Sequence, residues 1–196
     1  CQDTALLDLL SVEARRRLHL MDVPLVGSVL ASIAKTGVSS PVLCSRAVSK
    51  LKQTAPEDID SATKEELGVI AMAFGKLQAR DEKLFGIIAD SFLRRTSPPL
   101  RQGSLVSLVN IVHAFTKVHV THSKLFLAIS GVLVERFNEL SMAEAVKLMH
   151  GIGKVEYLPP PALQERLAEM VQSESIHSLG VFDLLKLATA AKRLGI

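Results

Sequence analysis

Basic residues recur at a nearly constant interval along this sequence. They are Lys35, Lys76, Lys117, Lys154 and Arg193, separated by 41, 41, 37 and 39 residues. The ten-residue windows that end at these positions hold eight Lys or Arg and no Asp or Glu. The other 146 residues hold 15 basic and 20 acidic residues. Regularly spaced positive charges of this kind could contact successive phosphates of a nucleic acid.

Polar residues one or two helical turns before each basic residue would share its face if the segments are helices. Together they form the candidate RNA-binding set: Lys35, Lys76, Asn110, His113, Lys117, Lys147, His150, Lys154, Lys186 and Arg193. A second explanation needs no ligand, because Lys and Arg in the last turn of a helix stabilise the negative end of its dipole. The short basic run Arg15–Arg17 is likewise either a solvated helix face or a contact with RNA or a partner.

Motifs for other chemistry are weak. The Gly-x-Gly-Lys segment ending at Lys154 resembles part of a P-loop, but GxxxxGK[ST] is absent and close helix packing explains the glycines better. His113, His119 and His122 lack nearby cysteines or carboxylates to complete a zinc site. The sequence has no GxSxG, HExxH or CxxC motif. We therefore expect no enzymatic activity, no metal or other cofactor, and no small-molecule substrate.

Helices must carry these residues, because apolar side chains recur at helical spacing almost everywhere and no stretch alternates long enough for a strand. The composition, 48% hydrophobic and 22% charged, excludes a disordered chain. Two cysteines are too few for a disulfide scaffold. No apolar run approaches the roughly 20 residues that span a bilayer. The sequence predicts an all-α fold without membrane insertion.

The helices that end at the basic residues, here called first helices, share an apolar pattern. Counting back from the basic residue, the ninth, sixth and second positions form one stripe, and the third position is small. The ninth position, which we expect to be buried, holds Val26, Leu67, Leu108, Ala145 and Leu184. Second helices are predicted near 41–52, 81–95, 123–137 and 160–172, and residues 54–63 read as a connection. This pattern predicts an α-solenoid of about five helical-hairpin repeats of 37–41 residues.

We expect one α-helical repeat domain over residues 1–196. Its repeats cover approximately 23–54, 63–96, 104–138, 141–173 and 178–196, after residues 1–20 as the end of a preceding repeat. Two helix starts have capping-box spacing, Thr63 with Glu66 and Ser141 with Glu144. Both ends of the sequence fall within a repeat, and it begins at Cys1. We therefore expect a longer natural protein, or ends that pack against another molecule, and any targeting peptide would be missing.

Two segments resemble a known repeat family. LVNIVHAFTKV (108–118) resembles the first helix of octotricopeptide and heptatricopeptide repeats and of the FAST-kinase-like repeats of mitochondrial RNA proteins. The family pattern runs close to NLLWALAKLG, and Asn110, Ala114 and Lys117 match its Asn, first Ala and Lys. His113 stands where the family usually has Trp. The tract PPPALQERLAEM (159–170) resembles the proline-opened second helix.

This resemblance implies an organellar protein, mitochondrial or alternatively plastid, that binds RNA in gene expression. We expect a structural subunit of the mitochondrial ribosome that contacts RNA, rRNA in this interpretation, and neighbouring protein subunits. The alternative is an RNA-free α-solenoid scaffold in another large mitochondrial complex. The net charge of +3 permits an RNA partner, while seven Phe, one Tyr and no Trp argue against an aromatic platform for bases. The RAP domain that often ends such proteins is not recognisable.

Overall fold

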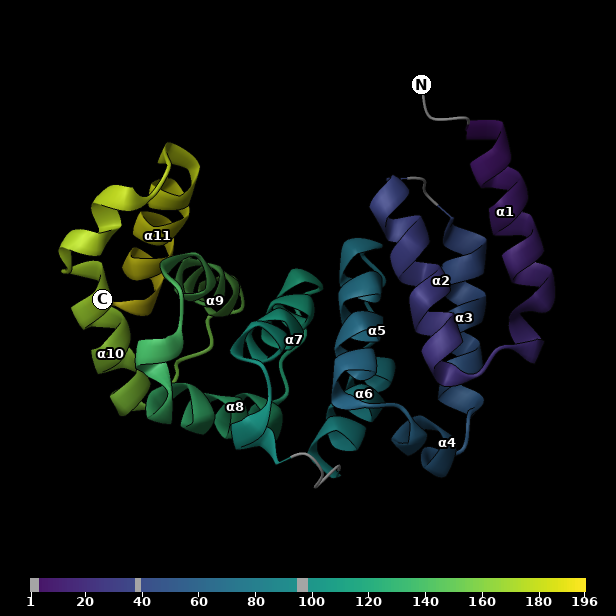
Figure 1. Ribbon diagram of the computed structural model, residues 1–196, viewed down its shortest axis with the longest axis horizontal. Helices are drawn as coiled ribbons and strands as arrows, with labels where there is room; N and C mark the ends of the chain where they lie inside the picture. The colour runs from purple at the N-terminus through teal and green to yellow at the C-terminus, as the bar shows by residue number, and fades with distance from the viewer. Residues whose placement is uncertain (1–3, 38–39, 95–98) are drawn as a thin grey trace. The chain divides into compact units, whose positions relative to one another are not determined.

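A computed structural model describes residues 4–37, 40–94 and 99–196, and every regular element within these ranges is a helix (Figure 1). The prediction of an all-α fold is confirmed. The chain divides into two compact units, residues 1–95 and residues 96–196. Over the described ranges, no helix combines the length and the apolar character needed to cross a membrane.

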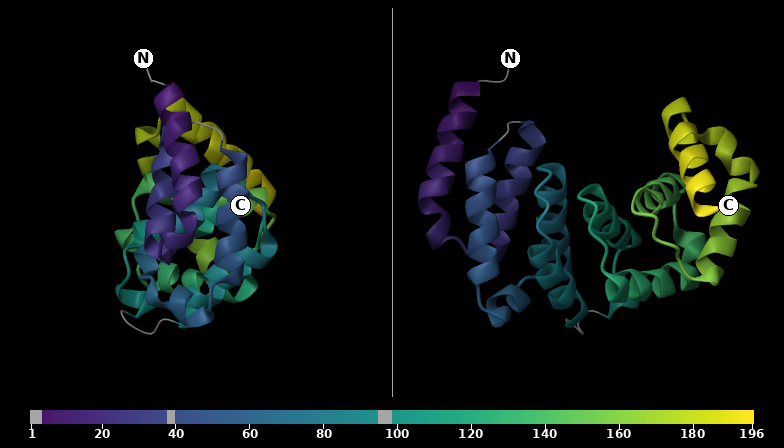
Figure 2. Two further views of the ribbon diagram at one scale, coloured as in Figure 1. Left: turned by 90° about the vertical axis from the view of Figure 1, so that its right-hand side faces the viewer. Right: turned by 180° about the vertical axis from the view of Figure 1, so that it is seen from behind.

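The helices of the first unit follow the predicted alternation of first and second helices. They are α1 (Thr4–Arg17), the short 3-10 helix η1 (Leu18–Leu20), α2 (Val23–Thr36), α3 (Pro41–Gln53), α4 (Pro56–Ser61), α5 (Lys64–Lys76) and α6 (Glu82–Arg94). The predicted first helices α2 and α5 lie side by side and form the main helix interface (Figure 1). The second helix α3 packs against α1 on one side and α6 on the other (Figure 2).

The second unit repeats this arrangement. Its elements are η2 (Leu100–Gln102), α7 (Leu105–Lys117), α8 (Ser123–Glu135), η3 (Phe137–Glu139), α9 (Met142–Lys154), α10 (Pro161–Val171), η4 (Glu174–Ser178) and α11 (Val181–Leu194). The first helix α9 packs against both α7 and α11, and the second helices α8 and α10 contact each other. Three first helices therefore stack in one row within this unit.

One helix was not predicted. The sequence pattern predicts a connection over residues 54–63, but α4 occupies Pro56–Ser61. Pro56 suits the first turn of a helix, and Glu57 and Asp58 complement the helix dipole there. Ile59, which is 2% exposed, anchors the helix to the core. At six residues α4 is too short to show helical periodicity, so the sequence pattern missed it.

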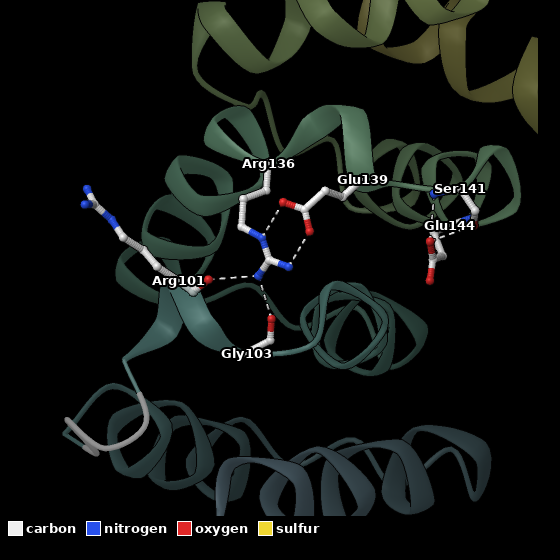
Figure 3. Close-up of polar contacts among 6 residues, drawn as sticks. All are labelled: Arg101, Gly103, Arg136, Glu139, Ser141 and Glu144. Carbon is white, nitrogen blue, oxygen red and sulfur yellow. Dashed lines mark hydrogen bonds and ion pairs between the residues drawn. The ribbon is translucent and has the colours of Figure 1, made fainter.

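Both predicted capping boxes are formed. In the first, the Thr63 hydroxyl accepts a hydrogen bond from the Glu66 amide at 3.1 Å, and the Glu66 carboxylate accepts from the Thr63 amide at 2.7 Å. The Ser141 and Glu144 pair repeats this exchange at 3.3 and 2.8 Å (Figure 3). Each box satisfies backbone amides that would otherwise lack a partner at the start of α5 and α9.

The predicted burial of the ninth position is confirmed in four of the five first helices. The ninth position is fully buried at Val26, Leu67, Leu108 and Ala145. The expectation was wrong for Leu184, which is 39% exposed. The neighbouring Phe182 and Leu185 are also exposed, because α11 packs against α9 through the side that carries Leu187 and Ala190. The opposite side of α11 therefore contributes nothing to the core.

Small residues at the third position allow close approach between first helices. Ala73, Ala114, Gly151 and Ala190 are buried, whereas Ser32 is exposed. A Cβ atom added to Gly151 would lie only 2.7 Å from the Thr116 hydroxyl oxygen. Glycine is therefore needed where α9 meets α7.

All five first helices end in the same backbone conformation. The residue two places after the repeated basic residue has a positive φ of 53° to 73° at Gly37, Gln78, His119, Glu156 and Gly195. The next amide donates back across the turn at 3.0–3.1 Å in four cases: Ala79 to Phe74, Val120 to Phe115, Tyr157 to Ile152 and Ile196 to Ala191. This is the hydrogen bond of a Schellman C-cap. The nearly constant interval between the basic residues is thus matched by a left-handed turn that recurs at the same interval in the backbone.

Replacing Gln78 with glycine is expected to stabilise the protein. Its φ of 55° strains a residue that has a Cβ atom. Relief of that strain should outweigh the greater freedom of glycine in the unfolded chain, and we expect the free energy of unfolding to rise by about 0.5–1 kcal/mol. Thermal unfolding followed by circular dichroism measures the change. Gln172→Gly is the matched control, because Gln172 is an exposed helix-end residue whose φ of −88° carries no such strain. This variant should be less stable than the wild type.

Candidate nucleic-acid interface

The five repeated basic residues occupy equivalent places. Lys35, Lys76, Lys117, Lys154 and Arg193 lie in the last turns of α2, α5, α7, α9 and α11, and all five are exposed. In the first unit, Lys35 and Lys76 end two helices that pack together. In the second unit, Lys117, Lys154 and Arg193 lie at the C-terminal ends of the three helices in the α7–α9–α11 row. The last turn is also where the helix dipole favours a cation, so position alone does not distinguish the two explanations.

Two histidines show that the candidates of the second unit gather on one surface. Burial, followed by the charges of Lys147, Lys117, Lys154 and His150, lowers the pKa of His113 from 6.5 to about 4. Burial, followed by the charges of Lys154, Lys186 and Arg193, also lowers the pKa of His150. Electrostatic effects of this kind require proximity. The basic face is defined as Asn110, His113, Lys117, Lys147, His150, Lys154, Lys186 and Arg193.

Little acidic charge balances this basic face. Lys186 forms an ion pair with Asp183 at 2.8 Å, but both side chains are more than 40% exposed, so the pair is weak. Over the described part of the chain, Lys117, Lys154 and Arg193 have no acidic partner within ion-pair distance. These three cations therefore present uncompensated positive charge to an approaching ligand.

Asn110 contacts another candidate residue. Its position two turns before Lys117 placed it in the candidate RNA-binding set, and its Oδ1 accepts a hydrogen bond from Nζ of Lys147 on the next first helix. Asn110 therefore orients a lysine. The Nδ1 atom of His113 is buried and has no hydrogen-bond partner among the described residues, and the lowered pKa keeps the ring neutral at pH 7. Charge on this face comes from Lys and Arg.

In the first unit the candidate site contains only lysines. The residues one and two turns before Lys35 are Ala31 and Ser28, and those before Lys76 are Met72 and Val69. None of these four is charged. The structure thus brings eight of the ten candidates together in the second unit, while Lys35 and Lys76 form a smaller pair in the first.

Arg136 holds the chain that leads into α7. Its Nη1 donates to the carbonyl oxygens of Arg101 at 2.8 Å and Gly103 at 2.7 Å, and its Nε and Nη2 donate to the Glu139 carboxylate at 3.0 and 2.6 Å (Figure 3). These hydrogen bonds lower the pKa of Glu139. Arg136 therefore joins the end of α8 to the start of the helix that carries Lys117. Sequence reasoning missed it, because carbonyl partners leave no sequence signal.

The remaining motifs have structural roles. Gly151 lies against Thr116, and a Cβ on Gly153 would lie 3.4 Å from the Ala190 Cα, so the Gly-x-Gly-Lys segment serves helix packing. His122 caps α8, since its Nδ1 accepts from the Leu125 amide at 3.2 Å. Among the residues that the structure describes, no cluster of three or more His, Cys, Asp or Glu could hold a metal ion.

A second group of cations was only partly anticipated. Arg15 and Arg16 from the basic run line a cavity of about 480 Å³ together with His19, Arg46 and Lys50. The four-residue spacing of Arg46 and Lys50 marks one helix face, but their meeting with α1 depends on tertiary packing.

No protein-family model matches the chain, and no curated protein does. The resemblance to octotricopeptide repeats therefore stays a prediction.

Proposed function

We propose that this chain is an organellar α-solenoid of about five helical-hairpin repeats that binds RNA through the ends of its first helices. The observation that carries the proposal is the basic face, where three stacked helices bring eight candidate residues together and where Lys117, Lys154 and Arg193 have no acidic partner within ion-pair distance among the described residues. Helix-dipole effects explain a cation at each helix end. They do not explain the further positive charges of Lys147 and Lys186, two turns earlier.

The arrangement favours an extended polyanion over a single anion. Packed helices lie about 8–10 Å apart, so Lys117, Lys154 and Arg193 are spread along the row of three helices and would not all meet at one phosphate. They suit successive phosphates along a strand. The eight residues of the basic face are basic or polar, so phosphates are the groups that it would recognise.

The cellular setting follows from the resemblance alone. In this proposal the protein is a structural subunit of the mitochondrial ribosome, contacts rRNA and protein neighbours, and catalyses no reaction. A plastid location is the alternative.

RNA binding is expected to depend steeply on salt. If five basic residues each neutralise one phosphate of a single strand, the log–log slope of affinity against salt is about −3.5, at roughly −0.7 per contact. Lys117→Gln combined with Lys154→Gln should reduce the slope by about 1.4. The reduction should be the same for oligouridine and a mixed-sequence RNA, because phosphate contacts carry no base information. Fluorescence anisotropy between about 50 and 200 mM salt measures both slopes.

A matched control separates this face from net charge. Lys124→Gln combined with Arg166→Gln removes the same charge from the second helices α8 and α10, where both side chains are exposed. This control should keep the wild-type slope. Equal loss in both double variants, or binding that does not respond to salt, would remove the basic face as the RNA site.

The RNA-free scaffold remains the second candidate because of one observation on α11. Val181, Phe182 and Leu185 are 80%, 81% and 66% exposed, and apolar side chains gathered in this way are typical of protein interfaces. A scaffold would show no measurable affinity for either RNA. Its Lys117 and Lys154 variant would still join its protein assembly normally.

A further inference from the structure

The first unit contains a cationic cavity that the RNA-binding proposal does not use. It has a volume of about 480 Å³ and lies between the end of α1, η1 and the second half of α3. Arg15, Arg16, Arg46 and Lys50 line it, together with His19. Within the part of the chain that the structure describes, no carboxylate side chain lines this cavity.

Local structure explains why these cations converge. Arg15 and Arg16 lie in the last turn of α1, and Arg46 and Lys50 are four residues apart on one face of α3. The two helices pack against each other (Figure 2), and η1 packs against α3. Leu18 of η1, which is 6% exposed, fixes the bend between α1 and α2. Four cations thus meet as a result of packing between segments about 30 residues apart.

Neighbouring negative charge does not cancel these cations. Glu13 pairs with Arg16 at 3.4 Å and with Arg17, while Arg15, Arg46 and Lys50 have no acidic partner within ion-pair distance among the described residues. The C-terminal ends of α1 and α3 contribute about half a negative charge each. The four cations carry a charge of about +4, and Glu13 together with the two helix ends contributes about −2. The net charge around the cavity is therefore about +2. Such a cluster of like charges is relieved by binding an anion.

We propose that this cavity binds a ligand with two or more adjacent phosphate groups, such as a diphosphate or triphosphate. Its volume lies in the range of small-ligand sites. Arginine guanidinium groups bind phosphate oxygens in pairs, and three of the four cations are arginines. No Phe, Tyr or Trp lines the cavity in the described structure. Recognition therefore rests on the phosphates and leaves open whether they belong to an RNA 5′ end or to a free nucleotide.

Calorimetric titration of the whole chain with inorganic tripolyphosphate tests the site. We expect saturable binding by the wild type, weakened about tenfold or more by Arg46→Gln combined with Lys50→Gln, because each loses a charge-assisted hydrogen bond. Arg46 is exposed and Lys50 half-buried, so this variant is expected to fold, and circular dichroism checks that it does. Arg15→Gln, on the other helix, gives an independent loss of affinity.

The basic-face variant Lys117→Gln with Lys154→Gln is the charge-matched control and should bind tripolyphosphate normally. Its RNA binding should show the reduced salt slope, whereas the cavity variant should keep the wild-type slope, so either proposal can fail alone. Wild-type protein that does not bind tripolyphosphate, or equal weakening in both double variants, would overturn the cavity site. Orthophosphate binding as tight as tripolyphosphate would overturn the preference for adjacent phosphates.

Two further titrations identify the source of the phosphates. RNA with a 5′-triphosphate should bind more tightly than the same RNA with a 5′-hydroxyl if the cavity holds an RNA end, and Arg46→Gln with Lys50→Gln should abolish that difference. A free nucleoside triphosphate that binds as tightly as tripolyphosphate, with no preference between the two RNAs, assigns the cavity to nucleotides. If neither phosphate-bearing ligand binds, the proposal fails.

Discussion

Replacing Phe115 with alanine is expected to lower the free energy of unfolding by about 3–5 kcal/mol. Phe115 has no exposed surface, and it lies on α7 in the second unit. Its ring meets Phe126 of α8 edge to face, with centroids 6.1 Å apart, and Phe126 meets Tyr157 in the same way at 5.0 Å. The substitution would leave a cavity and break this row of three rings, which joins α7, α8 and the connection after α9.

Urea unfolding followed by circular dichroism measures the loss. Phe182→Ala is the matched control, because Phe182 belongs to the same unit but is 81% exposed. Its substitution should change the free energy of unfolding by no more than about 0.5 kcal/mol. Similar stability in the two variants would contradict the assignment of Phe115 to the core.

Acidification is expected to destabilise the second unit through His113. Its pKa in the folded protein is about 4, compared with 6.5 ordinarily. As the pH falls through this range, the unfolded chain binds a proton that the folded chain does not. The stability contributed by the neutral ring is therefore complete above pH 6.5 and lost progressively down to about pH 4. We expect a loss of about 2 kcal/mol, less than the full linkage value because His113 is only half-buried.

Unfolding of wild type and His113→Gln over this pH range isolates the effect. The difference in the free energy of unfolding between the two proteins at pH 8 measures the change in packing. The variation of that difference with pH measures the contribution of His113 protonation. We expect the variant to lose less stability on acidification than the wild type. Parallel pH profiles would show that His113 does not titrate as its buried position requires. The acidic groups titrate alike in both proteins and cancel in the comparison.

Most of the helices were predictable because a buried helix face imposes its period on the sequence. Val26, Leu67 and Leu108 could be assigned to the core from that period, and the Thr63 and Glu66 capping box from spacing alone. Leu184 shows the limit of this reasoning. Its position in the pattern matches the others, but burial depends on a neighbouring helix, and nothing within α11 reports whether one is present.

The candidate site was predictable only where one helix determines it. Lys147 and Lys154 share a face of α9 because they are seven residues apart. The hydrogen bond from Lys147 to Asn110, and the meeting of Arg15 with Arg46, join residues about 30 or more positions apart. Such contacts follow from how helices pack. The left-handed turns at Gln78 and Glu156 also left no signal, since neither residue type favours that conformation.

The shared turn after each first helix makes the protein modular. Gly, Gln, His, Glu and Gly occupy the same left-handed position, so the main chain keeps its course while the residue changes. A segment cut from Glu156 to Gly195 would begin and end in one conformation, as would the segment from His119 to Glu156. Duplication or deletion of such a segment would therefore join the chain without a new kind of junction. During evolution, the number of helical hairpins in such a protein could therefore change by one at a time through duplication or deletion between equivalent turns.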